Sequence, residues 1–147
     1  MVSSDANKNI VFSISDWLSF EGDTGPYLMY SFARTQSILR KADGEGIKPI
    51  SGQFSHLLSS ETEIALLREL YDFNRTVLLA CENYRPSSVA NYLFSLCKEF
   101  NRFYREMPVL KADSSELRLA RLALVKCFGE VLKKGLALLG ISPPDRM

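Results

Sequence analysis

Apolar side chains recur along this chain at alternating steps of three and four residues, and this spacing constrains its fold more than any other feature. Residues three or four apart lie on one side of an α-helix. The spacing therefore predicts amphipathic helices, and no alternating β pattern competes with them beyond a weak one over residues 10–14. The stripes are Ile64, Leu67, Tyr71, Asn74, Leu78 and Cys81; Val89, Leu93, Leu96, Phe100 and Phe103; and Leu117, Ala120, Leu124, Phe128, Val131, Gly135 and Leu138.

A further helix is predicted over residues 26–41. Thr24 is a good N-cap, and Pro26 is tolerated in the first turn because its missing N–H is not needed there. Gly44, Gly46 and Pro49 end the helix. One side of it carries Leu28, Phe32 and Leu39, and another carries Tyr27, Tyr30 and Arg34.

Capping signals mark where the other helices begin. Ser60 and Glu63 are spaced as a capping box, in which Ser60 caps and Glu63 reaches back. Pro86 begins the next helix and Pro108 ends it, and a cap-like pair (Asp113 with Glu116) precedes a last helix over 114–139.

The predicted fold class is all-α, a helical bundle of four to five helices, the fifth being a short turn near residues 54–58. Residues 23–147 form one domain, and residues 1–22 form a lead-in segment.

Composition and charge exclude several classes of protein. With 147 residues, 46% hydrophobic and 24% charged, the chain is typical of one soluble globular domain. Its apolar runs are short, such as the four residues 77–80, whereas a membrane-spanning helix needs about 20. No secretory signal opens the chain, so we expect a cytoplasmic protein without a membrane partner.

The basic residues are concentrated in the second half of the chain. Residues 1–73 hold six basic and ten acidic residues, a net charge of −4, and residues 74–147 hold twelve and seven, a net +5. A chain of overall charge +1 is a weak candidate for wrapping nucleic acid nonspecifically. Two alternatives stay open for the second half, a small phosphate-contacting face or basic side chains that only solvate helix surfaces.

Metal-binding and catalytic signatures are lacking. The cysteines, Cys81, Cys97 and Cys127, are dispersed in apolar stretches, where reduced Cys packs as a small core residue. His56 is the single histidine, so neither a metal site nor a Ser-His-Asp triad is expected. Phosphate-binding loops and nucleophile elbows are also absent from the sequence.

Two segments closely resemble the C-terminal region of arginyl-tRNA synthetase, a class I enzyme. The first is Gly-Asp-Thr-Gly-Pro-Tyr at 22–27, which runs on to Arg34, and the second is Leu-Gly-Ile-Ser-Pro-Pro-Asp-Arg-Met at 139–147. Phe-Asn-Arg-Phe-Tyr at 100–104, followed by Pro-Val-Leu at 108–110, matches the family pattern between them. The Asp-Ala-Leu-Arg-like motif of the family stands here as Ser-Glu-Leu-Arg at 115–118, with only Leu and Arg retained.

The resemblance implies an α-helical anticodon-binding domain of an arginine-tRNA ligase. Its expected partners are arginine tRNA, through the anticodon loop, and the catalytic domain of the same enzyme, and we expect a monomer. ATP and Mg²⁺ are expected only in that catalytic domain, whose motifs this chain lacks, so the chain by itself is predicted to be non-catalytic. Residues 1–22 would then come from the missing catalytic region or be added sequence.

The resemblance also implies which residues bind RNA: Tyr27, Arg34, Tyr104 and Met147. Unpaired anticodon bases are read by stacking on aromatic rings and by hydrogen bonds to their edges. Helical spacing independently puts Tyr27 and Arg34 on one face, with Tyr30 between them. Secondary candidates for the RNA backbone are Tyr30, Arg118, Arg121 and Lys126, with Lys133 and Lys134 behind them.

Alternatives remain at this stage. Tyr27 could only pack at a helix start, and Tyr104, beside Phe100 and Phe103, could belong to the core. Pro108 stands where the family often has a bulky aromatic residue, which puts a base contact from that loop in doubt. The rival function is a helical protein-interaction adaptor, which would show a contiguous apolar patch and no RNA binding.

Overall fold

The computed structural model describes residues 24–49, 52 and 54–145. This part of the chain folds into five α-helices and one 3-10 turn, with no strand, so the all-α prediction is confirmed. The lead-in segment predicted at 1–22 lies outside it. The helices are α2 (Gly25–Gly44), α3 (Glu61–Tyr71), α4 (Phe73–Glu82), α5 (Pro86–Glu106) and α6 (Ser115–Leu138), and the turn η1 covers Ser55–Leu57.

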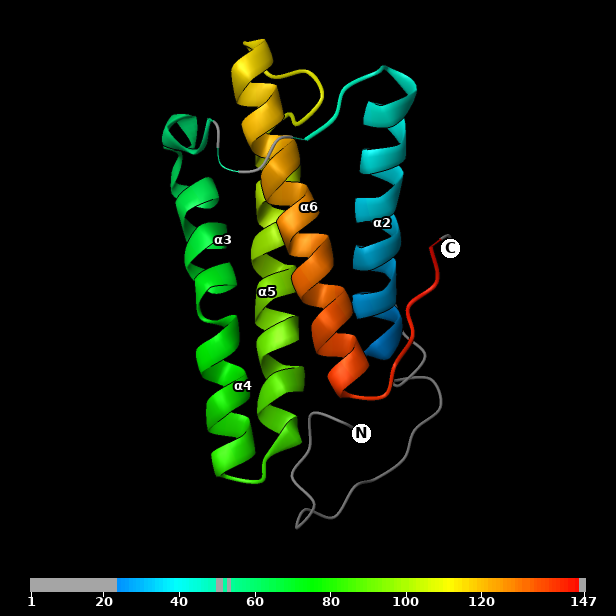
Figure 1. Cartoon of the computed structure of the whole chain (residues 1–147), viewed down its shortest axis with the longest axis vertical. Helices are drawn as coiled ribbons and strands as arrows, with labels where there is room; N and C mark the ends of the chain where they lie inside the picture. Colours follow the sequence, from blue (N-terminus) through cyan, green and yellow to red (C-terminus); the bar gives the residue numbers. More distant parts are fainter. Residues whose placement is uncertain (1–23, 50–51, 53, 146–147) are drawn as a thin grey trace.

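The helices form a bundle of four rods. Figure 1 shows α3 and α4 end to end along one side, α2 along the other, and α5 and α6 between them. Helix α5 packs against each of the other four α-helices and contributes more buried hydrophobic residues than any other helix. Phe100 of α5 stacks on Phe128 of α6 with ring centroids 3.8 Å apart. The largest fully buried side chains include Phe32, Phe100, Phe103, Phe128, Leu66, Leu93, Leu96, Leu122 and Leu132.

Side-chain caps begin three of the helices. Thr24 accepts a hydrogen bond from the backbone N–H of Tyr27 at 3.4 Å. The predicted capping box is present, because Ser60 Oγ accepts from the N–H of Glu63 and Glu63 accepts from the N–H of Ser60. Helix α6 is capped by Ser114, which accepts from the N–H of Leu117, and not by the predicted Asp113–Glu116 pair.

The stripe predicted over α3 and α4 is wrong by one helical face. Leu67, Tyr71 and Leu78 are exposed, whereas Leu66, Leu70 and Ala80 are buried. The error has a physical reason in Glu63. This carboxylate lies on the buried face, one turn before Leu66, and a charged residue there makes the inward face of the helix look polar in the sequence. The prediction of three core cysteines is also wrong, because only Cys97 is buried and Cys81 and Cys127 are exposed.

Two glycines of α6 allow close helix contacts. A Cβ atom added at Gly129 would lie 2.8 Å from Thr35 Cγ2 on α2, and one at Gly135 would lie 2.5 Å from Leu93 Cδ2 on α5. These distances are shorter than van der Waals contact, so α6 approaches its neighbours where it has no side chain. Within the described ranges, no helix is long and apolar enough to cross a membrane.

Candidate functional site

Arg34 lies at the centre of a polar and aromatic cluster between α2 and α5. Its Nη1 donates to Asn101 Oδ1 at 2.7 Å, and its Nη2 donates to the hydroxyl of Tyr30 at 3.1 Å. Its guanidinium carbon is 4.8 Å from the ring centroid of Tyr30 and 5.2 Å from that of Tyr104. Both distances are within the range of cation–π attraction, so two rings and two hydrogen bonds fix the guanidinium in place.

Asn101 joins this cluster to Tyr27. Its Nδ2 donates to the Tyr27 hydroxyl at 2.8 Å. Helical spacing explains the arrangement: Tyr27, Tyr30 and Arg34 share one face of α2, Asn101 and Tyr104 share one face of α5, and the two helices are in contact. We call these five residues the aromatic cluster.

The rings of the aromatic cluster differ in exposure. Tyr104 is 41% exposed and Tyr30 is 43% exposed, so part of each side chain is open to solvent. Tyr104 also stacks on the buried Phe100, with centroids 6.3 Å apart and planes at 21°. Tyr27 is half-buried and packs against the core with part of its ring. The core-packing alternative therefore applies in part to Tyr27 and does not apply to the exposed face of Tyr104.

Burial also affects the Tyr27 hydroxyl. Desolvation raises its pKa above the ordinary value, and the hydrogen bond that Asn101 donates opposes this rise in part. The hydroxyl therefore stays protonated at neutral pH and keeps a proton to donate.

An open groove of about 450 Å³ extends from Arg34 and Tyr104. Side chains of α2, including Ile38 and Lys41, form one wall, and Arg105 with the loop after α5 forms the other. Four cations line this groove: Arg34, Lys41, Arg105 and Lys111. A cationic groove beside exposed aromatic rings is the combination that single-stranded nucleic acids bind.

The family model described as "DALR anticodon binding domain" matches residues 28–147. The chain belongs to this family. Among similar proteins, the arginine–tRNA ligase of Bacteroides fragilis is 39% identical over 97% of this chain and 24% of its own length. That of Bdellovibrio bacteriovorus is 40% identical over the whole chain and 25% of its own length. The chain thus spans about a quarter of the length of these relatives.

Solved structures agree with this family. The DALR domain superimposes on the arginyl-tRNA synthetase of Thermus thermophilus with a TM-score of 0.86 and 41% identity, covering 99% of this chain and 25% of that one. The enzyme of Plasmodium falciparum gives a TM-score of 0.80 and 25% identity over the same shares.

The structure brings together three of the four RNA-binding residues that the sequence predicts. Tyr27, Arg34 and Tyr104 all belong to the aromatic cluster, and the secondary candidate Tyr30 joins them. Met147 lies outside the described residues. Sequence reasoning missed Asn101, although it stands one helical turn before Tyr104 and so on the same face of α5.

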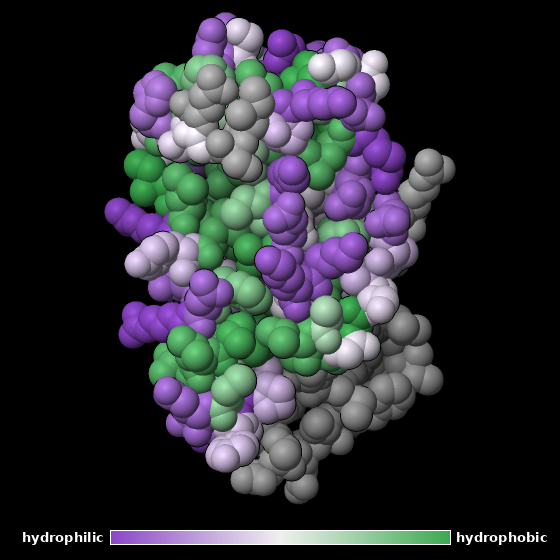
Figure 2. Space-filling model, viewed as in Figure 1, coloured by the Kyte–Doolittle hydropathy of each residue, from purple (hydrophilic) through white to green (hydrophobic). Residues whose placement is uncertain are grey.

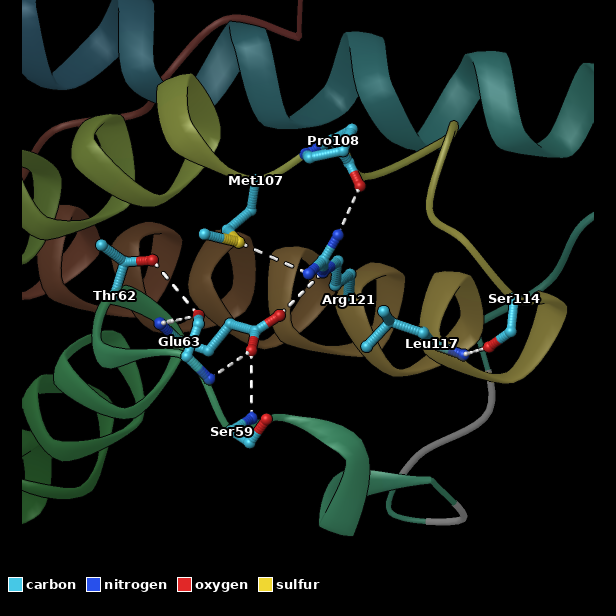
Figure 3. Close-up of polar contacts among 9 residues, drawn as sticks. Ser59, Thr62, Glu63, Met107, Pro108, Ser114, Leu117 and Arg121 are labelled. Atoms are coloured by element: carbon cyan, nitrogen blue, oxygen red, sulfur yellow. Dashed lines mark hydrogen bonds and ion pairs between the residues drawn. The ribbon is translucent and has the colours of Figure 1, made fainter.

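Arg121 is not available to the RNA phosphates that it was predicted to contact. It is 7% exposed, and its Nε lies 2.7 Å from Glu63 Oε1 (Figure 3). Its other nitrogens donate to the carbonyl oxygen of Pro108 at 2.9 Å and to Met107 Sδ at 3.4 Å. In the DALR domain Arg121 therefore links α6 to α3 and to the loop that borders the cationic groove.

Glu63 is ionised in this buried pair. Burial by itself raises the pKa of its carboxyl, but the hydrogen bonds from the Ser60 backbone and from Arg121 outweigh burial and lower the pKa below its ordinary value. Because both charges are paired and hydrogen-bonded, the ion pair is tolerated in the interior.

The other secondary candidates lie on α6. Lys126 is exposed and Arg118 is half-buried, and no hydrogen bond, ion pair or ring contact links either of them to the aromatic cluster. Their phosphate contacts stay predictions. The cations beside the cluster are instead Lys41, Arg105 and Lys111, which line the groove. They come together because α2 and the 107–111 loop lie on opposite sides of the groove.

Proposed function

We propose that this DALR domain binds the anticodon loop of arginine tRNA as part of an arginine–tRNA ligase. The observation that carries the proposal is the aromatic cluster: exposed rings of Tyr30 and Tyr104 hold a guanidinium between them at the mouth of a cationic groove. The rings offer stacking planes to unpaired bases, the guanidinium offers donors to base edges, and the groove accommodates the RNA backbone.

The remaining three quarters of the ligase would supply the chemistry. ATP and Mg²⁺ are assigned to that other part of the enzyme, because the sequence of this chain lacks the ATP-site motifs of the family. The DALR domain would contribute binding energy from the anticodon, which orients the distant acceptor end for the reaction. Its two partners are then arginine tRNA and the catalytic domain of the same ligase, acting in the cytoplasm, and we expect a monomer.

Direct titration tests this proposal. The chain is titrated with the anticodon stem-loop of an arginine tRNA and with the same stem-loop carrying a changed middle base, and the two dissociation constants are compared. We expect the unchanged loop to bind more tightly. Equal affinity for both loops would contradict anticodon recognition.

Removal of one stacking ring gives a sharper prediction. Tyr104→Ala should weaken binding of the unchanged loop by about 1–3 kcal/mol, the typical value of one base–aromatic stack. Tyr71→Ala is the matched control, because Tyr71 is 87% exposed and lies on α3, away from the aromatic cluster. An equal effect of the two substitutions, or a large fall in thermal midpoint for Tyr104→Ala, would favour a packing role.

A helical protein-interaction module is the second candidate, and one observation favours it. Leu67, Leu78 and Leu79 are exposed, and Figure 2 shows hydrophobic side chains gathered over α3 and α4. Such a module would bind neither stem-loop, so the same titration separates the two functions.

A further inference from the structure

Arg34 fixes the orientation of the Asn101 side-chain amide. A guanidinium carries donors only, so the Asn101 atom 2.7 Å from Arg34 Nη1 must be the amide oxygen. The amide nitrogen of Asn101 therefore faces Tyr27, whose hydroxyl oxygen is 2.8 Å away. Because this nitrogen only donates, the Tyr27 oxygen accepts and its own proton is turned away from Asn101.

The same reasoning holds for Tyr30. Its hydroxyl oxygen accepts from Arg34 Nη2 at 3.1 Å, so its proton also points away from the guanidinium. Arg34 uses one N–H of each terminal nitrogen in these two bonds, which leaves three of its five N–H groups for a ligand or water. The hydroxyl protons of Tyr27 and Tyr30 and three N–H groups of Arg34 are therefore not used within these bonds. Burial raises the pKa of Tyr27, so its hydroxyl retains its proton at neutral pH.

We propose that Asn101 is a positioning residue that sets the hydrogen-bond polarity of Tyr27, and that it thereby makes the aromatic cluster selective for the acceptor edge of a nucleobase. The inference rests on the proposed function. Cytosine and uracil are nearly the same size, but N3 is an acceptor in cytosine and a donor in uracil. Donors that meet N3 and O2 together match cytosine, the middle anticodon base that arginine codons require, because both atoms accept there, whereas uracil presents an N3–H donor beside its O2.

Asn101→Asp reverses this polarity with almost no change of shape. The carboxylate still accepts from Arg34, so the guanidinium stays in place, but it also accepts the proton of Tyr27 and leaves that hydroxyl with lone pairs facing outward. We expect affinity for the cytosine stem-loop to fall on the order of tenfold and the preference for cytosine over uracil to shrink or reverse.

Asn91→Asp is the matched control, because Asn91 is exposed on the same helix and the change of charge is identical. Added negative charge weakens binding of both loops equally. If Asn101→Asp lowers the affinity for the two loops by one common factor, as Asn91→Asp does, the polarity claim is overturned while the proposed function stands. If the unchanged chain fails to discriminate between the loops, the proposed function itself fails.

A second variant covers the case in which Asn101→Asp does not fold, and a spectroscopic readout gives an independent check where it does. Tyr27→Phe removes the hydroxyl and keeps the ring, so it should lose most of the preference for cytosine while retaining stacking; an unchanged preference overturns the inference. Where Asn101→Asp folds, the ultraviolet titration of its tyrosines should show a higher pKa for Tyr27 than in the unchanged chain. The double variant Asn101→Asp/Tyr27→Phe lacks the Tyr27 hydroxyl, so the signal that disappears in it belongs to Tyr27. An unaltered pKa would contradict the reversed hydrogen bond.

Discussion

At the scale of single residues, the buried ion pair between Glu63 and Arg121 joins several parts of the fold. Glu63 caps α3 with one carboxylate oxygen and binds Arg121 with the other, while Arg121 holds the loop at Met107 and Pro108. This ion pair therefore connects the start of α3, the first third of α6 and the edge of the cationic groove. Loss of this ion pair should therefore also displace the loop that borders the cationic groove.

Arg121→Met tests this role. It leaves the carboxylate of Glu63 buried without its partner, so we expect the free energy of unfolding to fall by about 3–5 kcal/mol in urea denaturation. Arg102→Met is the control, because the Arg102–Glu61 pair is exposed and should contribute far less. Similar losses in both variants would show that the buried pair has no special role.

The pH dependence of stability gives an independent check on the same pair. Because the folded pKa of Glu63 lies below its ordinary value of 4.5, the ionised carboxylate stabilises the fold above pH 4.5, and this contribution is lost as the pH falls through the folded pKa. The free energy of unfolding, measured from pH 6 down to pH 3, should therefore fall less steeply for Glu63→Gln than for the unchanged chain. Parallel curves would contradict an ionised Glu63.

At the scale of helices, close approach at glycine decides how α6 sits against α2. Gly129→Ala would gain about 1 kcal/mol in helix propensity, but its Cβ would lie 2.8 Å from the methyl group of the fully buried Thr35. Thr35 is β-branched and its hydroxyl donates to the Ser31 carbonyl, so it cannot turn aside at low cost. We expect a net loss of about 1 kcal/mol, because overpacking of a core costs about 1–3 kcal/mol.

A double-mutant cycle isolates this contact. Thr35→Ser removes the methyl group and keeps the hydroxyl, so in that background Gly129→Ala should be neutral or stabilising in urea denaturation. An equal cost of Gly129→Ala in both backgrounds would mean that the helices yield elsewhere and that the contact with Thr35 is not limiting.

The helices and the caps at Thr24 and Ser60 could be predicted from the sequence because the signals are local, whereas the cap of α6 is Ser114 and not the predicted Asp113–Glu116 pair. Ser60 and Glu63 are three residues apart, and the shared face of Tyr27 and Arg34 needs only the pitch of one helix. The buried side of α3 could not be predicted, because Glu63 becomes an interior residue only when Arg121, 58 positions later, neutralises it. Asn101 was missed for the same reason, since its role depends on which face of α5 meets α2.

At the scale of the whole molecule, electrostatics restricts how this domain would bind RNA. The net charge is only +1, so the charge of the whole domain attracts RNA weakly. Binding must therefore rely on the local cations of the groove. Each phosphate that is neutralised on a single strand adds about −0.7 to the slope of log affinity against log salt concentration. A groove lined by Arg34, Lys41, Arg105 and Lys111 therefore predicts a modest slope, set by a few contacts.

Lys111→Ala should remove one of these contacts. We expect weaker binding of both stem-loops by the same factor and a slope smaller by about 0.7, measured from 50 to 300 mM salt. Lys126→Ala makes the same change of charge on the exposed surface of α6, outside the groove, and should leave the slope unchanged. If Lys126→Ala lowers the slope and Lys111→Ala does not, the RNA backbone follows α6, as the basic second half of the sequence suggests, and the groove between α2 and the 107–111 loop is not its path.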